Sequence, residues 1–146
     1  MKSIFDKPNY EELVIRLQKL NSLSTPQWGK MSVAEMLHHL NLTVEAPLGK
    51  IQTNGKPNFI MKIFKSVLYN DKAFGKGDPT PKDFKVAGTY KFESEKEKCL
   101  QNLNEVFNKG AKGNYKPHVF FGKITDEQWG MHFYKHTDHH LRQFGV

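Results

Sequence analysis

The sequence predicts an all-α fold, an expectation that depends on three observations. Apolar residues recur at three- and four-residue spacing in five stretches of the chain. A serine or threonine followed three positions later by Glu or Gln, typical of helix starts, precedes two of these stretches. Convincing two-residue alternation, the mark of a half-buried strand, is missing, although residues 86–92 alternate weakly. Five helical patterns without a clear sheet indicate a helical bundle.

The first two predicted helices lie in the N-terminal third. The first covers residues 9–23, with apolar residues on one face: Leu13, Leu17 and Leu20. The second covers residues 32–45, where the Ser32 hydroxyl can cap the helix while the Glu35 carboxylate reaches back to it. It has to end there because Pro47 cannot continue a helix.

The other three predicted helices are separated by a long connection. The third covers residues 58–70, which are rich in Phe, Ile, Val and Leu. Residues 71–92, rich in Gly, Lys and Pro, are expected to form a long exposed loop that could cover the mouth of a site. The fourth helix covers residues 94–108, with acidic residues at its start that suit the helix dipole. The fifth opens at a capping box and covers residues 125–144.

Length and composition are those of one globular domain, residues 1–146. The net charge of +7 comes from lysines spread along the chain rather than from a basic block, which favours a solvated surface over nucleic-acid binding. The single cysteine, Cys99, cannot form an internal disulfide, and neither a membrane-spanning apolar run nor a signal sequence is visible. We therefore expect a cytoplasmic protein that binds neither membrane nor nucleic acid.

Histidines are concentrated in the last predicted helix. His136 and His140 are four residues apart and fall on the helical face that carries the large aromatic residues of this stretch. Neutral imidazole is a common ligand of divalent metals, so this pair predicts half of a metal site. The alternative is that each ring is a buried histidine that hydrogen-bonds to a carbonyl or a carboxylate. His132 and His139 lie at the edge of the same face and could replace or supplement a ligand.

The best third ligand is on the second predicted helix. His39 lies nearer its apolar face, and His38 nearer solvent, although a rotated helix would exchange them. His118 fits a structural role in a loop better. Glu45 could orient a ligand or act as a base, but a solvated carboxylate at the helix end is the simpler interpretation. Three histidines from two helices would leave a metal with an open position, as catalytic metal sites have.

Two segments resemble a known superfamily. Residues 28–40, WGKMSVAEMLHHL, resemble the start of the second helix of DinB-like proteins, and residues 136–144, HTDHHLRQF, resemble their last helix. Residues 117–129 are similar to an uncharacterised branch of that superfamily. The resemblance covers both ends of the chain but not its middle.

This resemblance implies a four-helix bundle, often a homodimer, in which three histidines hold a divalent metal. Carried over by position, the ligands are His39, His136 and His140, and the metal could be zinc, nickel, iron or manganese. Characterised relatives include transferases that use bacillithiol or glutathione and a mycothiol-dependent maleylpyruvate isomerase. The resemblance thus implies an enzyme that activates a bound thiol or water, a transferase or a hydrolase, acting on a small molecule such as a low-molecular-weight thiol.

A second hypothesis belongs to another class of protein. The chain could be a non-catalytic helical module that binds a partner or dimerises, with histidines that are only structural. Its lysine-rich loop could then face an acidic partner. Metal content and a pocket that opens onto the histidines separate the two hypotheses.

Overall fold

A computed structural model describes residues 1–57, 60, 63–78 and 80–146 of the chain. The predicted all-α fold is confirmed: within these residues the structure has no β-strand, only one β-bridge between His118 and Gly122. The α-helices described are α1 (Lys7–Lys19), α2 (Val33–Glu45), α4 (Phe92–Lys109) and α5 (Asp126–Gln143). Short 3-10 helices are η1 (Lys65–Leu68), η2 (Lys82–Phe84) and η3 (Gly110–Lys112).

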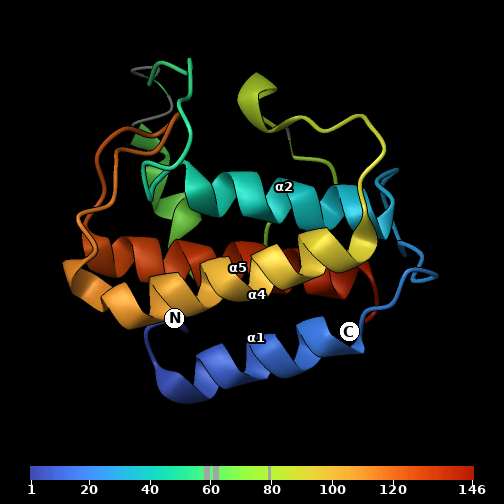
Figure 1. The fold of residues 1–146 in the computed structure, drawn as a ribbon. Helices are drawn as coiled ribbons and strands as arrows, with labels where there is room; N and C mark the ends of the chain where they lie inside the picture. Colours follow the sequence, from blue (N-terminus) through green and yellow to red (C-terminus); the bar gives the residue numbers. More distant parts are fainter. Residues whose placement is uncertain (58–59, 61–62, 79) are drawn as a thin grey trace.

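The four α-helices form a bundle (Figure 1). Helices α1 and α5 run in one direction, and α2 and α4 run in the other. Each of α1 and α2 packs against both α4 and α5, so that α1 and α2 lie on opposite sides of the bundle. The loops that follow α2 and precede α5 meet at one end, whereas the loop that leads into α4 extends over α2 (Figure 1).

Both predicted capping boxes are present. The Ser32 hydroxyl accepts from the backbone N–H of Glu35 (3.3 Å), and the Glu35 carboxylate accepts from the N–H of Ser32 (2.7 Å). Thr125 and Gln128 exchange the same pair of bonds at the start of α5. These contacts satisfy N–H groups that have no partner within the helix, and they fix where α2 and α5 begin.

Other helix boundaries differ from the prediction. Helix α1 ends at Lys19 rather than at residue 23, because the Asn21 side chain accepts from the N–H of Leu23 and closes a turn there. Helix α4 begins at Phe92, two residues earlier than predicted. Four positions of the predicted helix 58–70, namely 58, 59, 61 and 62, lie outside the described residues, and η1 occupies 65–68.

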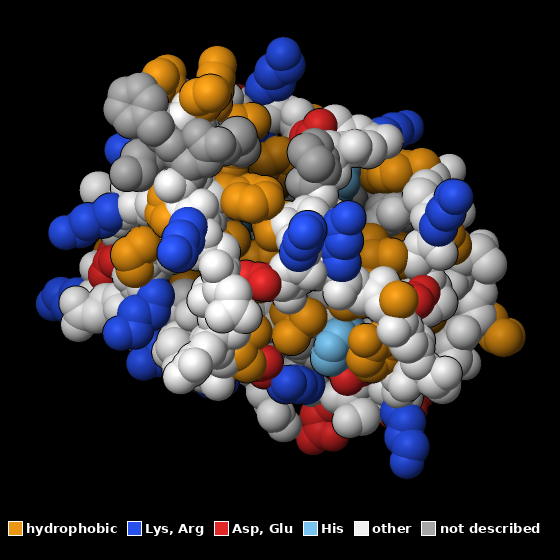
Figure 2. Space-filling model, turned by 90° about the horizontal axis from the view of Figure 1, so that it is seen from above, with side chains coloured by type: hydrophobic (Ala, Val, Ile, Leu, Met, Phe, Trp, Pro, Cys, Tyr) orange, Lys and Arg blue, Asp and Glu red, His pale blue; other side chains and the backbone are white. Residues whose placement is uncertain are grey.

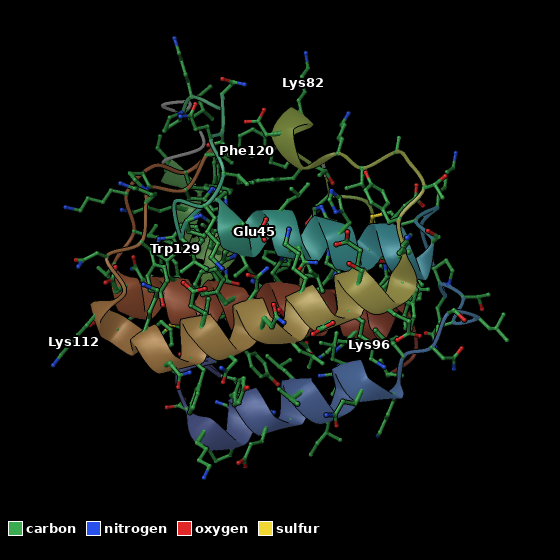
Figure 3. The ribbon with its side chains drawn as sticks, in the orientation of Figure 1. Glu45, Lys82, Lys96, Lys112, Phe120 and Trp129 are labelled. Atoms are coloured by element: carbon green, nitrogen blue, oxygen red, sulfur yellow. The ribbon has the colours of Figure 1, made fainter. Side chains whose placement is uncertain are left out.

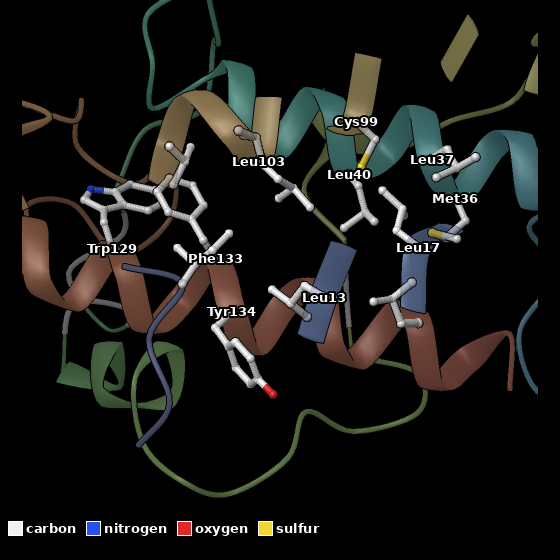
Figure 4. Close-up of a cluster of buried hydrophobic side chains, with 14 of the residues drawn as sticks. Leu13, Leu17, Met36, Leu37, Leu40, Cys99, Leu103, Trp129, Phe133 and Tyr134 are labelled. Carbon is white, nitrogen blue, oxygen red and sulfur yellow. The ribbon is translucent and has the colours of Figure 1, made fainter. Parts of the chain in front are cut away.

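The core lies along the centre of the bundle, where all four helices contribute large apolar side chains. Leu17 of α1, Leu40 of α2, Leu103 of α4 and Phe133 of α5 are all almost fully buried (Figure 4). Burying such side chains is the main source of stability, and it holds α2 and α5 at a fixed separation. That separation matters because both helices carry histidines.

A polar seam joins α2 to α4. Asn102 donates to the Asn41 side chain (3.0 Å) and to the Glu45 carboxylate (3.3 Å), and Lys98 forms an ion pair with Glu45 (2.8 Å). Figure 3 shows Glu45 on the side of α2 that faces α4. The interpretation of Glu45 as a solvated helix-end carboxylate was therefore wrong, because this carboxylate is buried between two helices.

Among the described residues, no helix combines the length and the apolar content needed to cross a membrane.

Candidate metal centre

The three histidines selected from the sequence lie together. His39 of α2 faces His136 and His140 of α5, and one ring nitrogen from each lies within 4.8 Å of the others. The Nε2 atoms of His39 and His136 are 3.3 Å apart. The rings meet edge to face, with centroids 4.8 to 5.1 Å apart, so that they converge on one point rather than stack.

Each of these rings uses its Nδ1 for a hydrogen bond to a fixed acceptor. The Nδ1 of His39 donates to the backbone carbonyl of Phe84 (2.8 Å). The Nδ1 of His140 donates to the side-chain oxygen of Gln143 (2.8 Å). The side-chain nitrogen of Gln143 in turn donates to the Trp28 carbonyl (2.8 Å). Because a carbonyl can only accept, these bonds assign the proton to Nδ1 of both rings.

The Nδ1 of His136 lies 3.3 Å from the Thr43 hydroxyl. Thr43 donates its own proton to the Leu40 carbonyl (2.9 Å), so its oxygen is left to accept from His136. With the proton of His136 on Nδ1, all three rings present the lone pair of Nε2, which is the set of tautomers that a bound cation requires.

This arrangement suits a cation. Two lone pairs 3.3 Å apart repel each other unless a positive charge lies between them. Two nitrogens bound to zinc in a tetrahedral site are about 3.3 Å apart, given typical Zn–N distances of about 2.0–2.1 Å. Metal-binding histidines characteristically donate their second N–H to a carbonyl or side-chain acceptor, as all three rings do here. The residues present therefore fit a divalent metal.

Burial keeps these rings neutral, which a metal ligand has to be. Desolvation lowers the pKa of His39, lowers that of His136 well below its usual value, and lowers that of His140 to about 3. Repulsion between protonated histidines that lie close together lowers these pKa values further. The lone pairs on Nε2 are thus available near neutral pH.

The remaining histidines lie outside the triad. His38 points away from the site: its ring stacks on Tyr90 (centroids 4.0 Å apart), and its Nδ1 lies 3.2 Å from the Glu95 carboxylate. The Nδ1 of His118 accepts from two backbone N–H groups of its own loop, as the structural role predicted. His132 is buried beside His136 with stacked rings (centroids 5.6 Å apart), and His139 is half-buried.

Several residues that support the site were not recognised in the sequence. The sequence analysis assigned no role to Thr43, to Gln143 or to the carbonyl of Phe84, which hold the three rings. A threonine four residues after His39 and a glutamine three residues after His140 were the available signals, since both spacings place side chains on one helix face. The Phe84 contact comes from a loop distant in sequence and left no such signal. Lys135 of α5 is also buried, and its amine donates to the backbone carbonyl and the side-chain oxygen of Asn70, just after η1.

The triad opens into a large cavity of about 770 Å³. Its walls come from the N-terminal approach to α2, the loops after α2 and before α5, and the connection that precedes α4. Phe74 belongs to that connection, and its ring meets those of His132, His136 and His139 edge-on (centroids 5.9 to 6.2 Å apart). Phe120 belongs to the loop before α5 (Figure 3). The volume is that of a pocket for a small organic molecule.

Cys99 is excluded as the reacting thiol. It is buried in the core between α2 and α4, and burial raises its pKa to about 12. A thiol with so high a pKa is almost entirely protonated near neutral pH. Any thiol chemistry at the triad therefore has to use a thiol that enters the cavity from outside.

Comparison with known proteins gives one match. A family described as "Protein of unknown function (DUF1569)" matches residues 5–145. No curated protein and no solved structure matches the chain.

Proposed function

The chain belongs to the DUF1569 family, whose description assigns no activity, and from its site we propose a metal-dependent enzyme of the DinB-like type. His39, His136 and His140 would hold one divalent ion, and the enzyme would activate a small thiol or a water for transfer or hydrolysis. Zinc, nickel, iron and manganese all accept imidazole ligands.

The observation that carries this proposal is the convergence of the three rings, each with its Nδ1 at hydrogen-bonding distance from an oxygen. Each Nδ1–H is held by an acceptor that α2, α5 or η2 positions, and each Nε2 lone pair is left for a ligand. Structural histidines that only satisfy their own hydrogen bonds have no reason to converge with three unprotonated nitrogens. The cavity favours an enzyme over a purely structural site, because it gives an organic molecule access to the triad.

A divalent metal on three protein ligands supplies an open position and lowers the pKa of a group bound there. The chain's own residues hold the geometry: Thr43 and Gln143 contact two of the rings by hydrogen bonds, and aromatic side chains line the cavity beside the triad. Among the described residues that line the cavity, the one carboxylate is Asp78. One of its oxygens accepts from the N–H of Gly75 and closes a turn.

This shortage of carboxylates favours a thiol over water as the nucleophile. A thiol has a pKa of about 8.5 and ionises near neutral pH with little help. Water has a pKa of about 15.7, so it needs a large shift from the metal, and a carboxylate base would assist its ionisation. We therefore place thiol transfer ahead of hydrolysis.

The test compares two adjacent histidines on α2. The untagged protein, purified without chelator or reconstituted with each metal in turn, is expected to contain about one divalent ion per chain by mass spectrometry. His39→Ala should lose this ion, whereas His38→Ala should retain it, because His38 faces α4. Circular dichroism checks that both variants fold. An equal metal content in wild type and His39→Ala would refute the proposal.

A second step tests the chemistry. The metal-loaded protein is assayed for transfer of small thiols to an electrophile such as 1-chloro-2,4-dinitrobenzene, with the His39→Ala variant as the blank. Turnover that requires both metal and His39 supports a transferase.

A further inference from the structure

We propose that the molecule bound in this cavity is an organic anion, with an apolar body along the aromatic walls and its charged group at a rim of lysines. This inference rests on the proposed function, because it names the substrate class of the same site. It is drawn from the charges around the cavity and from the nature of its walls.

The walls of the cavity are mainly apolar. Trp28, Phe74, Phe84 and Phe120 line it on several sides, and Trp129 lines its inner end. A ligand body that replaces water at such walls binds through the hydrophobic effect and through ring contacts. The body of the ligand is therefore aromatic or aliphatic.

The charges at the cavity are almost all positive. Lys30, Lys76 and Lys116 line it, against the single carboxylate of Asp78. No acidic side chain pairs with any of these lysines in the part of the chain that the structure describes. By contrast, Lys98 of the polar seam pairs with Glu45, and Lys50, which donates to Asn102 of that seam, pairs with Glu105. Figure 2 shows a face on which Lys and Arg side chains stand among exposed hydrophobic ones.

A bound metal would increase this positive charge. Its three ligands are neutral imidazoles, and carboxylates are missing from the set, so a divalent ion would keep its full charge of two. Together with the lysines it makes a cavity that attracts anions and binds neutral molecules of the same shape less well.

One of the lysines contacts an aromatic ring, and another lies against the backbone of the loop after α2. Lys76 lies over the Trp28 ring, with its Nζ 4.5 Å from the ring centroid. The stem of Lys116 lies across Gly49, where a Cβ would be 3.4 Å from the lysine Cε, and its backbone N–H donates to the Pro47 carbonyl (2.8 Å). Positioned lysines lose less freedom when a ligand binds than free ones do.

The experiment uses two probes that share their rings and differ in charge. These are 8-anilinonaphthalene-1-sulfonate, an anion, and N-phenyl-1-naphthylamine, which is neutral. Chelator-treated protein is titrated with each, and the emission of Trp28 and Trp129, the two tryptophans of the chain, reports binding because both line the cavity. We expect one sulfonate probe per chain, bound more weakly as salt is added.

The variant K30Q/K76Q/K116Q should raise the Kd of the sulfonate probe about tenfold, since each exposed ion pair contributes modestly. The Kd of the neutral probe should change less than about twofold. The matched control is K19Q/K112Q/K123Q, which removes the same charge from lysines outside the cavity and should leave both probes nearly unaffected. Equal losses in the two triple variants, or equal effects on the two probes, would overturn the inference.

This design separates the inference from the proposed function. The titration is made without metal, so it tests the lysine rim alone, and metal content tests the triad alone. If K30Q/K76Q/K116Q alone loses affinity for the sulfonate probe but the wild type binds no metal, the anion site stands and the proposed enzyme is refuted. If the wild type binds metal but the affinity for the sulfonate probe does not depend on the cavity lysines, the anion site is refuted and the proposed enzyme stands.

Discussion

Three hydrogen bonds decide which ring nitrogens of the triad are free. His39, His136 and His140 would be ordinary buried histidines if their Nδ1 atoms had no acceptors, because either ring nitrogen could then carry the proton. The Phe84 carbonyl and the Gln143 amide oxygen remove that choice for His39 and His140. The Thr43 hydroxyl, which donates to the Leu40 carbonyl, favours the same tautomer for His136. Residues that never touch the ion would thus set its affinity.

Gln143 gives the sharpest test of this argument. Gln143→Ala should weaken metal binding by about ten- to a hundredfold, measured by competition with a chromogenic chelator, because His140 loses its acceptor. Gln143→Glu is the matched control: it keeps an acceptor for His140 and loses the donor to the Trp28 carbonyl. The metal affinity of Gln143→Glu should be equal to or higher than that of wild type. Weakening of both variants to the same extent would show that Gln143 acts on the Trp28 loop instead.

The buried histidines also predict how stability depends on pH in the metal-free protein. Burial lowers the pKa of His140 to about 3 and that of His136 well below its usual value, whereas in the unfolded chain both have a pKa of about 6.5. Below pH 6.5 the unfolded chain therefore binds more protons than the folded one, and stability falls as pH falls. The loss is about 1.4 kcal/mol per pH unit for each such histidine.

Urea unfolding at pH 7.5, 6.5 and 5.5 checks this dependence. The midpoint should fall across the series, and it should fall less steeply in His140→Asn. A midpoint that stays constant from pH 7.5 to 5.5 would show that the histidines are not buried in solution as the structure has them.

Individual residues of the site were partly predictable. The helical spacing of His136 and His140 was sufficient to place both on one face, and the apolar pattern of α2 separated His39 from His38. The partners of the rings were not predictable to the same degree, because a hydrogen bond to the Phe84 carbonyl joins positions 45 residues apart. Periodicity carries no information about such a contact.

Among the secondary-structure elements, α5 shows a close contact at a glycine inside the helix. The carbonyl of Gly130 accepts from the N–H of Ile4 (3.1 Å), and a Cβ at this position would lie 2.5 Å from Ser3 Oγ and 2.6 Å from the Phe5 ring. The glycine lets the N-terminal segment lie directly against α5, although glycine costs helix stability.

Gly130→Ala should therefore destabilise the fold by about 1–3 kcal/mol, despite the better helix propensity of alanine. Urea unfolding measures the change. In a Phe5→Ala background the same substitution should cost clearly less, because part of the clash has been removed. Equal costs in the two backgrounds would contradict the close contact.

Helix starts were predictable where a local signal determines them, and helix ends were less so. The capping boxes at Ser32 and Thr125 involve residues three positions apart, so they can be read directly from the sequence. The predicted end of α1 was four residues too late, because a turn closed by Asn21 ends the helix although the apolar pattern continues to Leu23. Leu23 is in fact exposed.

For the molecule as a whole, the bundle brings α2 and α5 together and the loops add the cavity. The all-α fold followed from periodicity alone. The cavity did not, because its walls come from four separate parts of the chain and depend on how the loops fold back over the triad. The expectation that the connection before α4 covers a site agrees with Phe74 and Phe84, which both line the cavity.

A metal that joins α2 to α5 should stabilise the whole fold. An ion that binds the folded chain at about a thousand times its Kd adds about 4 kcal/mol, which for a chain of this length raises Tm by roughly 10 °C. Differential scanning calorimetry with and without chelator measures the shift. The His39→Ala variant should show no shift, and a similar shift in that variant would indicate that the metal binds elsewhere.

The most direct test of the central claim is X-ray absorption spectroscopy of the zinc-reconstituted protein, before and after a small thiol is added. We predict three imidazole nitrogens at about 2.0–2.1 Å and a further light ligand, replaced by one sulfur at about 2.3 Å when the thiol binds. A spectrum without imidazole scattering would contradict the triad. A fourth protein ligand that the thiol cannot displace would contradict the open position on which the proposed chemistry depends.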